Sequence, residues 1–222
     1  MKKLGLFAGV LLSAVLLFSC DLFAGAGEEF MDTNLLPAEF EDGDYLKIPA
    51  GTNEDGSVNY YYYEIETYYS FGHYYDKDGN ELGVSNYKAE HNELGCIGRV
   101  GNSNVSLYVL HDSATDTYWM SSVLYMPKKE NSIGLYQDFF IYADGNKDRT
   151  LRFRSNGSLS MNYSNFIKGE WTADGSKISL WFTYKDIDSG EVIKEEYDGR
   201  LAANGILYLW LVPIEKVAKI GD

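Results

Sequence analysis

The clearest strand pattern of this chain runs from Thr150 to Trp210, which reads TLRFRSNGSLSMNYSNFIKGEWTADGSKISLWFTYKDIDSGEVIKEEYDGRLAANGILYLW. Apolar and polar side chains alternate in several short runs, which is the period of a strand with one buried face. Turn-forming pairs such as Asn156-Gly157, Asp174-Gly175 and Asn204-Gly205 separate these runs. The stretch therefore predicts an antiparallel meander of about six strands.

The end of this meander and the overall composition indicate the class of fold. Residues 206–211 are apolar on both faces, as expected of a strand that protein covers on two sides. Aromatic residues make up 15% of the chain, 19 residues are Tyr, and only 4 are Pro. Tyr suits sheets, because its ring packs on the pleated surface and its hydroxyl group stays in water. We therefore expect an all-β protein whose antiparallel meander closes as an up-and-down barrel or forms a strongly curved sandwich.

The first residues have the organisation of an export signal. Met1-Lys2-Lys3 is basic, and residues 4–18 form an uncharged apolar run that is short for a membrane span. Leu17-Phe18-Ser19-Cys20 resembles the lipobox of bacterial lipoproteins. The resemblance implies that Cys20 becomes the mature N-terminus and carries acyl chains that insert into the bilayer. The alternatives are an ordinary cleaved signal with a chance Cys, or an uncleaved anchor helix.

The charge of the chain bears on its partners. Removing residues 1–19 takes away Lys2 and Lys3 and no acid, so 17 basic residues stand against 33 acidic ones and the formal charge becomes −16. The mature chain therefore lacks the basic clusters that bind nucleic acid or anionic lipid. We therefore expect no nucleic-acid partner, and contact with the lipid bilayer through acylated Cys20. The expected location is the cell envelope, lipid-anchored on the periplasmic or surface face of a bacterial membrane.

Three segments follow from these patterns. Residues 1–19 are the expected signal peptide, residues 20–42 the lipidated Cys and a flexible tether, and residues 43–222 a single β-barrel-like domain. A polar break near residues 127–137 is a candidate sub-boundary within that domain. An alternative for the tether is that residues 30–40 dock on the domain as a short helix.

Residues 58–69 contain six tyrosines and form the most aromatic segment of the chain. At a period of two, Tyr61 and Tyr63 share one face with Ile65, and Tyr60 and Tyr62 lie on the other. The segment is either a long strand with one buried face, or an aromatic wall for a sugar, lipid or peptide ligand. Further strands are expected at residues 44–48, 83–87, 94–100, 105–111, 118–125 and 139–142.

The sequence contains no pattern typical of catalysis or metal binding. His73, His91 and His111 stand outside the usual ligand spacings, and no nucleophile elbow, zinc-protease helix or phosphate loop is present. We therefore predict a protein that is not an enzyme and has no catalytic residue, no metal and no cofactor. Once Cys20 carries lipid, Cys96 has no partner for a disulfide and is best explained as a small buried apolar residue.

Several features of the meander occur together in a known group of proteins. They are Leu151-Arg152-Phe153, the Asn156-Gly157 turn, Gly169-Glu170-Trp171 and the apolar strand at residues 205–209. In these features the chain resembles the small lipocalin-like domains of bacterial lipoproteins. The resemblance implies an up-and-down barrel in which Trp171 plugs one end and a ligand enters at the other.

Two functions are compatible with such a barrel. In the first, a membrane-anchored, non-catalytic envelope lipoprotein binds a small apolar or aromatic ligand inside the barrel. In the second, a structural or interaction lipoprotein has a barrel filled by its own side chains and binds another envelope protein. Fold analogy alone favours the first. Its expected ligand-binding residues are Tyr61, Tyr63, Phe182, Tyr208 and Trp210.

Overall fold

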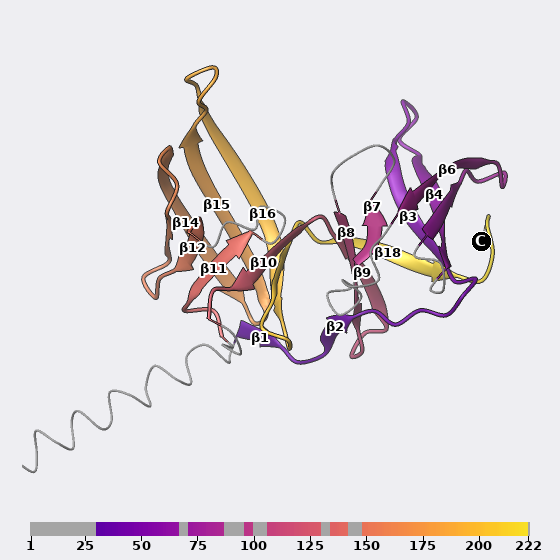
Figure 1. The fold of residues 1–222 in the computed structure, drawn as a ribbon, viewed down its shortest axis with the longest axis horizontal. Helices are drawn as coiled ribbons and strands as arrows, with labels where there is room; N and C mark the ends of the chain where they lie inside the picture. Colours follow the sequence, from indigo (N-terminus) through magenta and orange to yellow (C-terminus); the bar gives the residue numbers. More distant parts are fainter. Residues whose placement is uncertain are drawn as a thin grey trace, which may run out of the picture.

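A computed structural model of the protein describes residues 30–66, 71–86, 96–99, 106–129, 134–141 and 148–221. The described residues form two β-sheets that make two lobes (Figure 1). The expected signal peptide, the lipobox, Cys20 and His91 lie outside the described residues, so the predictions about them stay predictions.

Eight antiparallel strands close into a barrel in one lobe. Each strand pairs with the next along the chain, and β17 pairs with both β16 and β10, which joins the two edges of the sheet. The prediction of an all-β protein with a closed antiparallel barrel is therefore confirmed. The strands are β10 (Val123–Pro127), β11 (Asp138–Ile141), β12 (Thr150–Phe153), β13 (Ser158–Met161), β14 (Phe166–Asp174), β15 (Lys177–Lys185), β16 (Val192–Ala202) and β17 (Leu207–Leu209).

The predicted meander supplies the last six of these strands, β12 to β17. As the apolar pattern of residues 206–211 indicated, β17 is covered on both sides. Leu207 and Leu209 belong to the core inside the barrel, while Tyr208 packs outside it with Tyr108 of the other lobe. A strand that is part of two cores holds the lobes together.

A second sheet, which the sequence did not lead us to expect, forms the other lobe. Its order is β2-β8-β9-β18-β3-β4-β5-β6, and β7 pairs with β8. Strand β18 lies between β9 and β3, so the sheet combines the last described strand with strands that lie much earlier in the chain. The strands are β2 (Leu35–Pro37), β3 (Tyr45–Thr52), β4 (Val58–Glu66), β5 (Phe71–Tyr75), β6 (Glu81–Asn86), β7 (Cys96–Arg99), β8 (Ser106–Asp112), β9 (Thr117–Ser121) and β18 (Val212–Val217).

The chain crosses between the sheets at two neighbouring places. One crossing lies at Ser122 between β9 and β10, so the single strand expected at residues 118–125 is divided. The other lies between β17 and β18. The Ser121 side chain is 1% exposed, and its hydroxyl group donates to the carbonyl oxygen of Leu209 at 2.6 Å, which ties the crossings together. The first crossing falls a few residues before the 127–137 stretch, where a sub-boundary was expected.

Residues 31–37 correct the expectation of a flexible tether up to residue 42. They form β1 (Met31–Asp32), which pairs in parallel with β16 of the barrel, and β2, which pairs with β8 of the second sheet. Both segments are strands, so they also differ from the alternative prediction that residues 30–40 dock as a short helix. Apolar side chains explain the docking, because Leu35 is fully buried between the lobes.

Candidate functional site

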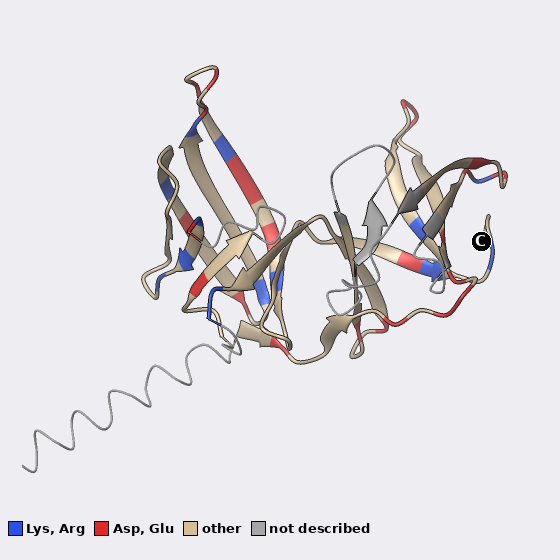
Figure 2. Ribbon diagram, in the orientation of Figure 1, with Lys and Arg blue, Asp and Glu red and all other residues tan. Residues whose placement is uncertain are grey.

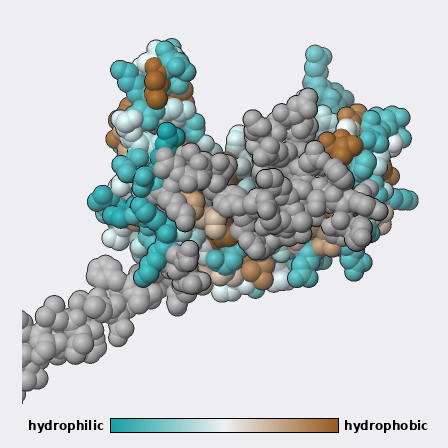
Figure 3. Space-filling view, viewed as in Figure 1, coloured by the Kyte–Doolittle hydropathy of each residue, from teal (hydrophilic) through white to brown (hydrophobic). Residues whose placement is uncertain are grey.

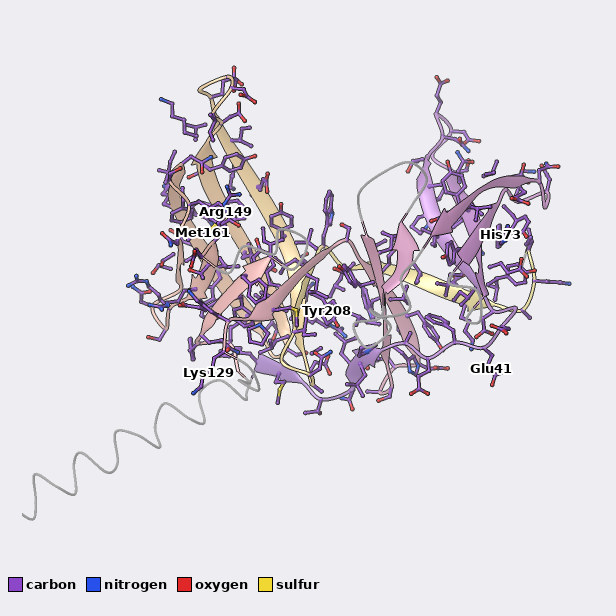
Figure 4. The ribbon with its side chains drawn as sticks, viewed as in Figure 1. Glu41, His73, Lys129, Arg149, Met161 and Tyr208 are labelled. Carbon is purple, nitrogen blue, oxygen red and sulfur yellow. The ribbon has the colours of Figure 1, made fainter. Side chains whose placement is uncertain are left out.

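A cavity of about 480 Å³ lies at one end of the barrel. At this end β10, β14 and β16 begin and β11, β13 and β15 finish, as the strand pairing shows. We call it the open end. Inward-facing side chains of several strands line the cavity, and they include Tyr125, Met161, Phe182, Tyr184, Glu195 and Tyr197. Met161 is labelled on its strand in Figure 4.

The opposite end of the barrel is filled by aromatic side chains. Trp171 of β14 is buried there, and its indole nitrogen donates to the carbonyl oxygen of Arg154 at 2.9 Å. Ring centroids of Phe30, Phe153 and Tyr136 lie 5.5, 5.6 and 6.1 Å from that of Trp171, all in edge-to-face contact. Trp171 therefore occupies the position that the lipocalin-like resemblance implied, and we call this the closed end.

One carboxylate lies within the largely apolar lining of the cavity. Glu195 accepts hydrogen bonds from the hydroxyl groups of Tyr184, at 2.9 Å, and of Tyr197. Burial and the hydrogen bond to Glu195 raise the pKa of Tyr197 above its ordinary value. The hydrogen bond from Tyr184 to Glu195, together with burial, raises the pKa of Tyr184. Both phenols therefore stay neutral donors over the whole physiological pH range.

Tyr125 adds a further hydroxyl group to the cavity. Its side chain is almost completely buried, and burial raises its pKa. The negative charge of Glu195 acts in the same direction. The site thus combines apolar and aromatic walls with a few polar groups that converge on one region, which is the usual composition of a small-molecule pocket.

The five residues expected to line one barrel interior do not lie together. Phe182 lines the cavity. Tyr61 and Tyr63 lie on β4 of the second sheet, where Tyr61 is 39% exposed and Tyr63 packs against Tyr74 with ring centroids 4.8 Å apart. For Tyr61 and Tyr63 the prediction is wrong, because a period of two shows which residues share a face but not which sheet their strand joins.

The other two expected residues lie near the barrel but not inside it. Tyr208 faces outward from β17 and is buried among residues of both lobes. Figure 4 labels it between the lobes. Trp210 follows β17 at the crossing, is 60% exposed and has a φ of 58°. Its ring makes an edge contact with Tyr197, with centroids 6.1 Å apart. Trp210 is therefore a neighbour of the cavity, and Tyr208 is part of the interface between the lobes.

Four residues that line the cavity were not predicted from the sequence: Tyr125, Tyr184, Glu195 and Tyr197. A signal for part of the set was present, because Glu195 and Tyr197 alternate with Lys194 and Glu196 on a strand that the meander predicted. An inward carboxylate could be distinguished from the many other acids only once the face of β16 that points into the barrel was known.

Each of the two histidines among the described residues lies beside an acidic side chain. His111 lies 2.9 Å from Asp116, and His73 lies 3.4 Å from Glu81. Within the described ranges, no group of three or more His, Cys, Asp or Glu side chains could hold a metal ion. The same ranges include no helix with the length and apolarity that a membrane crossing requires.

Comparison with known proteins found no matching protein family, no matching curated protein and no matching solved structure. The geometry of the cavity and the N-terminal sequence are therefore the basis for a functional proposal.

Proposed function

We propose that the protein is a non-catalytic, membrane-anchored lipoprotein of the bacterial envelope that binds a small apolar or aromatic ligand at the open end of its barrel. The observation that carries the proposal is the cavity of about 480 Å³, lined by aromatic and aliphatic side chains. Its volume lies within the range of about 300 to 1,000 Å³ that is typical of ligand pockets.

The attachment of the chain supports the same proposal. Phe30, the first described residue, packs against Trp171 at the closed end. The described part of the chain therefore begins at the end of the barrel opposite to the cavity, and this entry point does not cover the cavity.

The alternative function has partial support. In that alternative the barrel is filled by its own side chains and binds another envelope protein. Phe139 and Phe153 are buried in the barrel and continue the edge-to-face aromatic packing from Trp171 at the closed end. The described residues do not fill the open end in this way, since they leave a cavity that Tyr125 and Phe182 line. We therefore favour the ligand-binding function.

Calorimetric titration of the mature chain (residues 20–222) carrying Cys20→Ser tests the proposal. The titrants are indole, a fatty alcohol, a fatty acid and an arylalkyl amine. We expect saturable binding of at least one of them.

Met161→Trp should weaken this binding about tenfold or more, because the larger ring occupies the cavity. Ile167→Trp is the matched control, since Ile167 is 50% exposed on another strand of the barrel and does not line this cavity. Absence of saturable binding for all four compounds would contradict the proposal.

A further inference from the structure

The inward position of Glu195 sets it apart from the other acids of its strand. Along β16 the exposed residues Lys194 and Glu196 alternate with the half-buried Glu195 and Tyr197. Glu195 lies directly opposite Phe182 in the sheet, and both line the cavity. A barrel that is filled by its own side chains would carry an apolar residue at such a position.

Glu195 keeps hydrogen-bond acceptor positions that the described residues do not occupy. A carboxylate offers about four acceptor positions, and the hydroxyl groups of Tyr184 and Tyr197 occupy two. Both donors are neutral, so they solvate the charge of Glu195 without balancing it. Among the described residues, Lys194 pairs with Glu196 on the outside of the barrel, and no ion pair includes Glu195.

The surroundings of Glu195 favour a cation over an anion. Tyr125, Phe182, Tyr184 and Tyr197 present aromatic rings to the same cavity, and ring faces attract ammonium groups. Acidic residues also form a run along β16 (Figure 2). The formal charge of the whole chain is −14, so cations are attracted to the body and anions are repelled.

We infer that Glu195 makes the cavity selective for ligands that carry a protonated amine on an apolar or aromatic body. The inference rests on the proposed function, because it names the ligand class for the same cavity. In the bound state the ammonium group donates to the free acceptor positions of Glu195, and the apolar body packs against Phe182 and Met161. A carboxylate ligand would place two negative charges together in this cavity and is disfavoured.

Three compounds with one skeleton test the selectivity: phenylpropylamine, phenylpropanol and phenylpropanoate. They are titrated calorimetrically at neutral pH into the mature chain carrying Cys20→Ser. We expect the amine to bind about tenfold or more tightly than the alcohol, as a charge-assisted hydrogen bond predicts. The carboxylate should bind most weakly. Glu195→Gln should weaken amine binding about tenfold and leave alcohol binding within about twofold.

Glu196→Gln is the matched control, because it removes the same formal charge from the neighbouring residue on the outer face. It should leave amine binding nearly unchanged. Circular dichroism and the unfolding midpoint establish that each variant is folded. Equal loss of amine binding in Glu195→Gln and Glu196→Gln would overturn the inference, since the general field of the protein would then account for the preference.

The outcome also separates this inference from the proposed function. Alcohol binding as tight as amine binding would overturn the amine selectivity and leave a ligand-binding barrel in place. Tighter binding of phenylpropanoate than of the amine would also overturn the amine selectivity. Arg149 would then be the candidate partner of the carboxylate, because its guanidinium group lies 5.5 Å from the ring centroid of the lining residue Tyr163. No binding of these three or of the four earlier titrants would overturn both proposals.

Discussion

Gly199 lies where β16 pairs with β17 to close the barrel. A Cβ atom at this position would come within 2.3 Å of the carbonyl oxygen of Tyr208 and 2.5 Å of a methyl group of Leu209. Because the carbonyl oxygen belongs to a paired strand, it cannot move aside without breaking the pairing of Gly199 with Leu209. We predict that Gly199→Ala lowers the free energy of unfolding by about 2 kcal/mol or more, measured by denaturant titration.

Gly83→Ala on β6 is the control for this substitution. A Cβ atom there meets no atom within 4 Å, so the variant should unfold within about 0.5 kcal/mol of the parent protein. If Gly199→Ala unfolded at the same denaturant concentration as Gly83→Ala, the close contact of β16 with β17 would be disproved.

Three elements meet at Arg200 on β16. Its guanidinium group lies 3.3 Å from the carboxylate of Asp32, on β1, and 2.8 Å from that of Asp112, on β8. Both carboxylates are buried. Arg200→Met would leave them without a counter-charge, and we predict a loss of about 3 kcal/mol or more of unfolding free energy at pH 7. Arg152→Met, which removes a more exposed pair with Asp138, should cost no more than about 1 kcal/mol.

The pH dependence of the unfolding free energy provides a second test of the ion pairs that Arg200 forms with Asp32 and Asp112. Burial raises the pKa of Asp112, but hydrogen bonds from Arg200 and Ala114 and the charge of Arg200 outweigh it, so the net pKa is lowered. A carboxyl group with a lowered pKa stabilises the fold above its unfolded pKa of about 4, and this stabilisation is lost as the pH falls through the folded value. The difference in unfolding free energy between the parent protein and Arg200→Met should therefore shrink from pH 7 to pH 3. A constant difference would show that Arg200 acts through packing alone.

The same elements show how far the sequence could predict the structure. The hairpins from β12 to β17 were predictable because neighbouring strands pair through short turns, and the alternation of Leu151 and Phe153 with arginines shows the buried face. The second sheet was not predictable in this way, because β18 pairs with β3 across more than 150 residues of chain. Local patterns do not encode such a pairing. For this reason Phe182 was correctly expected to line the cavity, while Tyr61 was placed in the wrong sheet.

The net charge of the protein bears on its attachment to a membrane. The described surface of the tall β15–β16 hairpin is mostly hydrophilic, with an isolated apolar spot near its tip (Figure 3). The formal charge of −14 for the full chain, or −16 after removal of residues 1–19, repels anionic headgroups. Attachment would therefore depend on the acyl chains of Cys20, because two or more chains anchor a protein stably without further contacts.

Fractionation of cells tests whether membrane attachment depends on the acylation of Cys20. We predict that the parent protein sediments with the membranes and that Cys20→Ala, which cannot be acylated, is recovered mainly in the soluble fraction. Cys96→Ala is the matched control, because it removes the other Cys of the chain and leaves the lipobox intact, so it should stay with the membranes. Recovery of Cys20→Ala in the membrane fraction, resistant to a high-salt wash, would show that an uncleaved apolar segment holds the protein. The ligand cavity would remain, but its chain would then be anchored by residues 4–18.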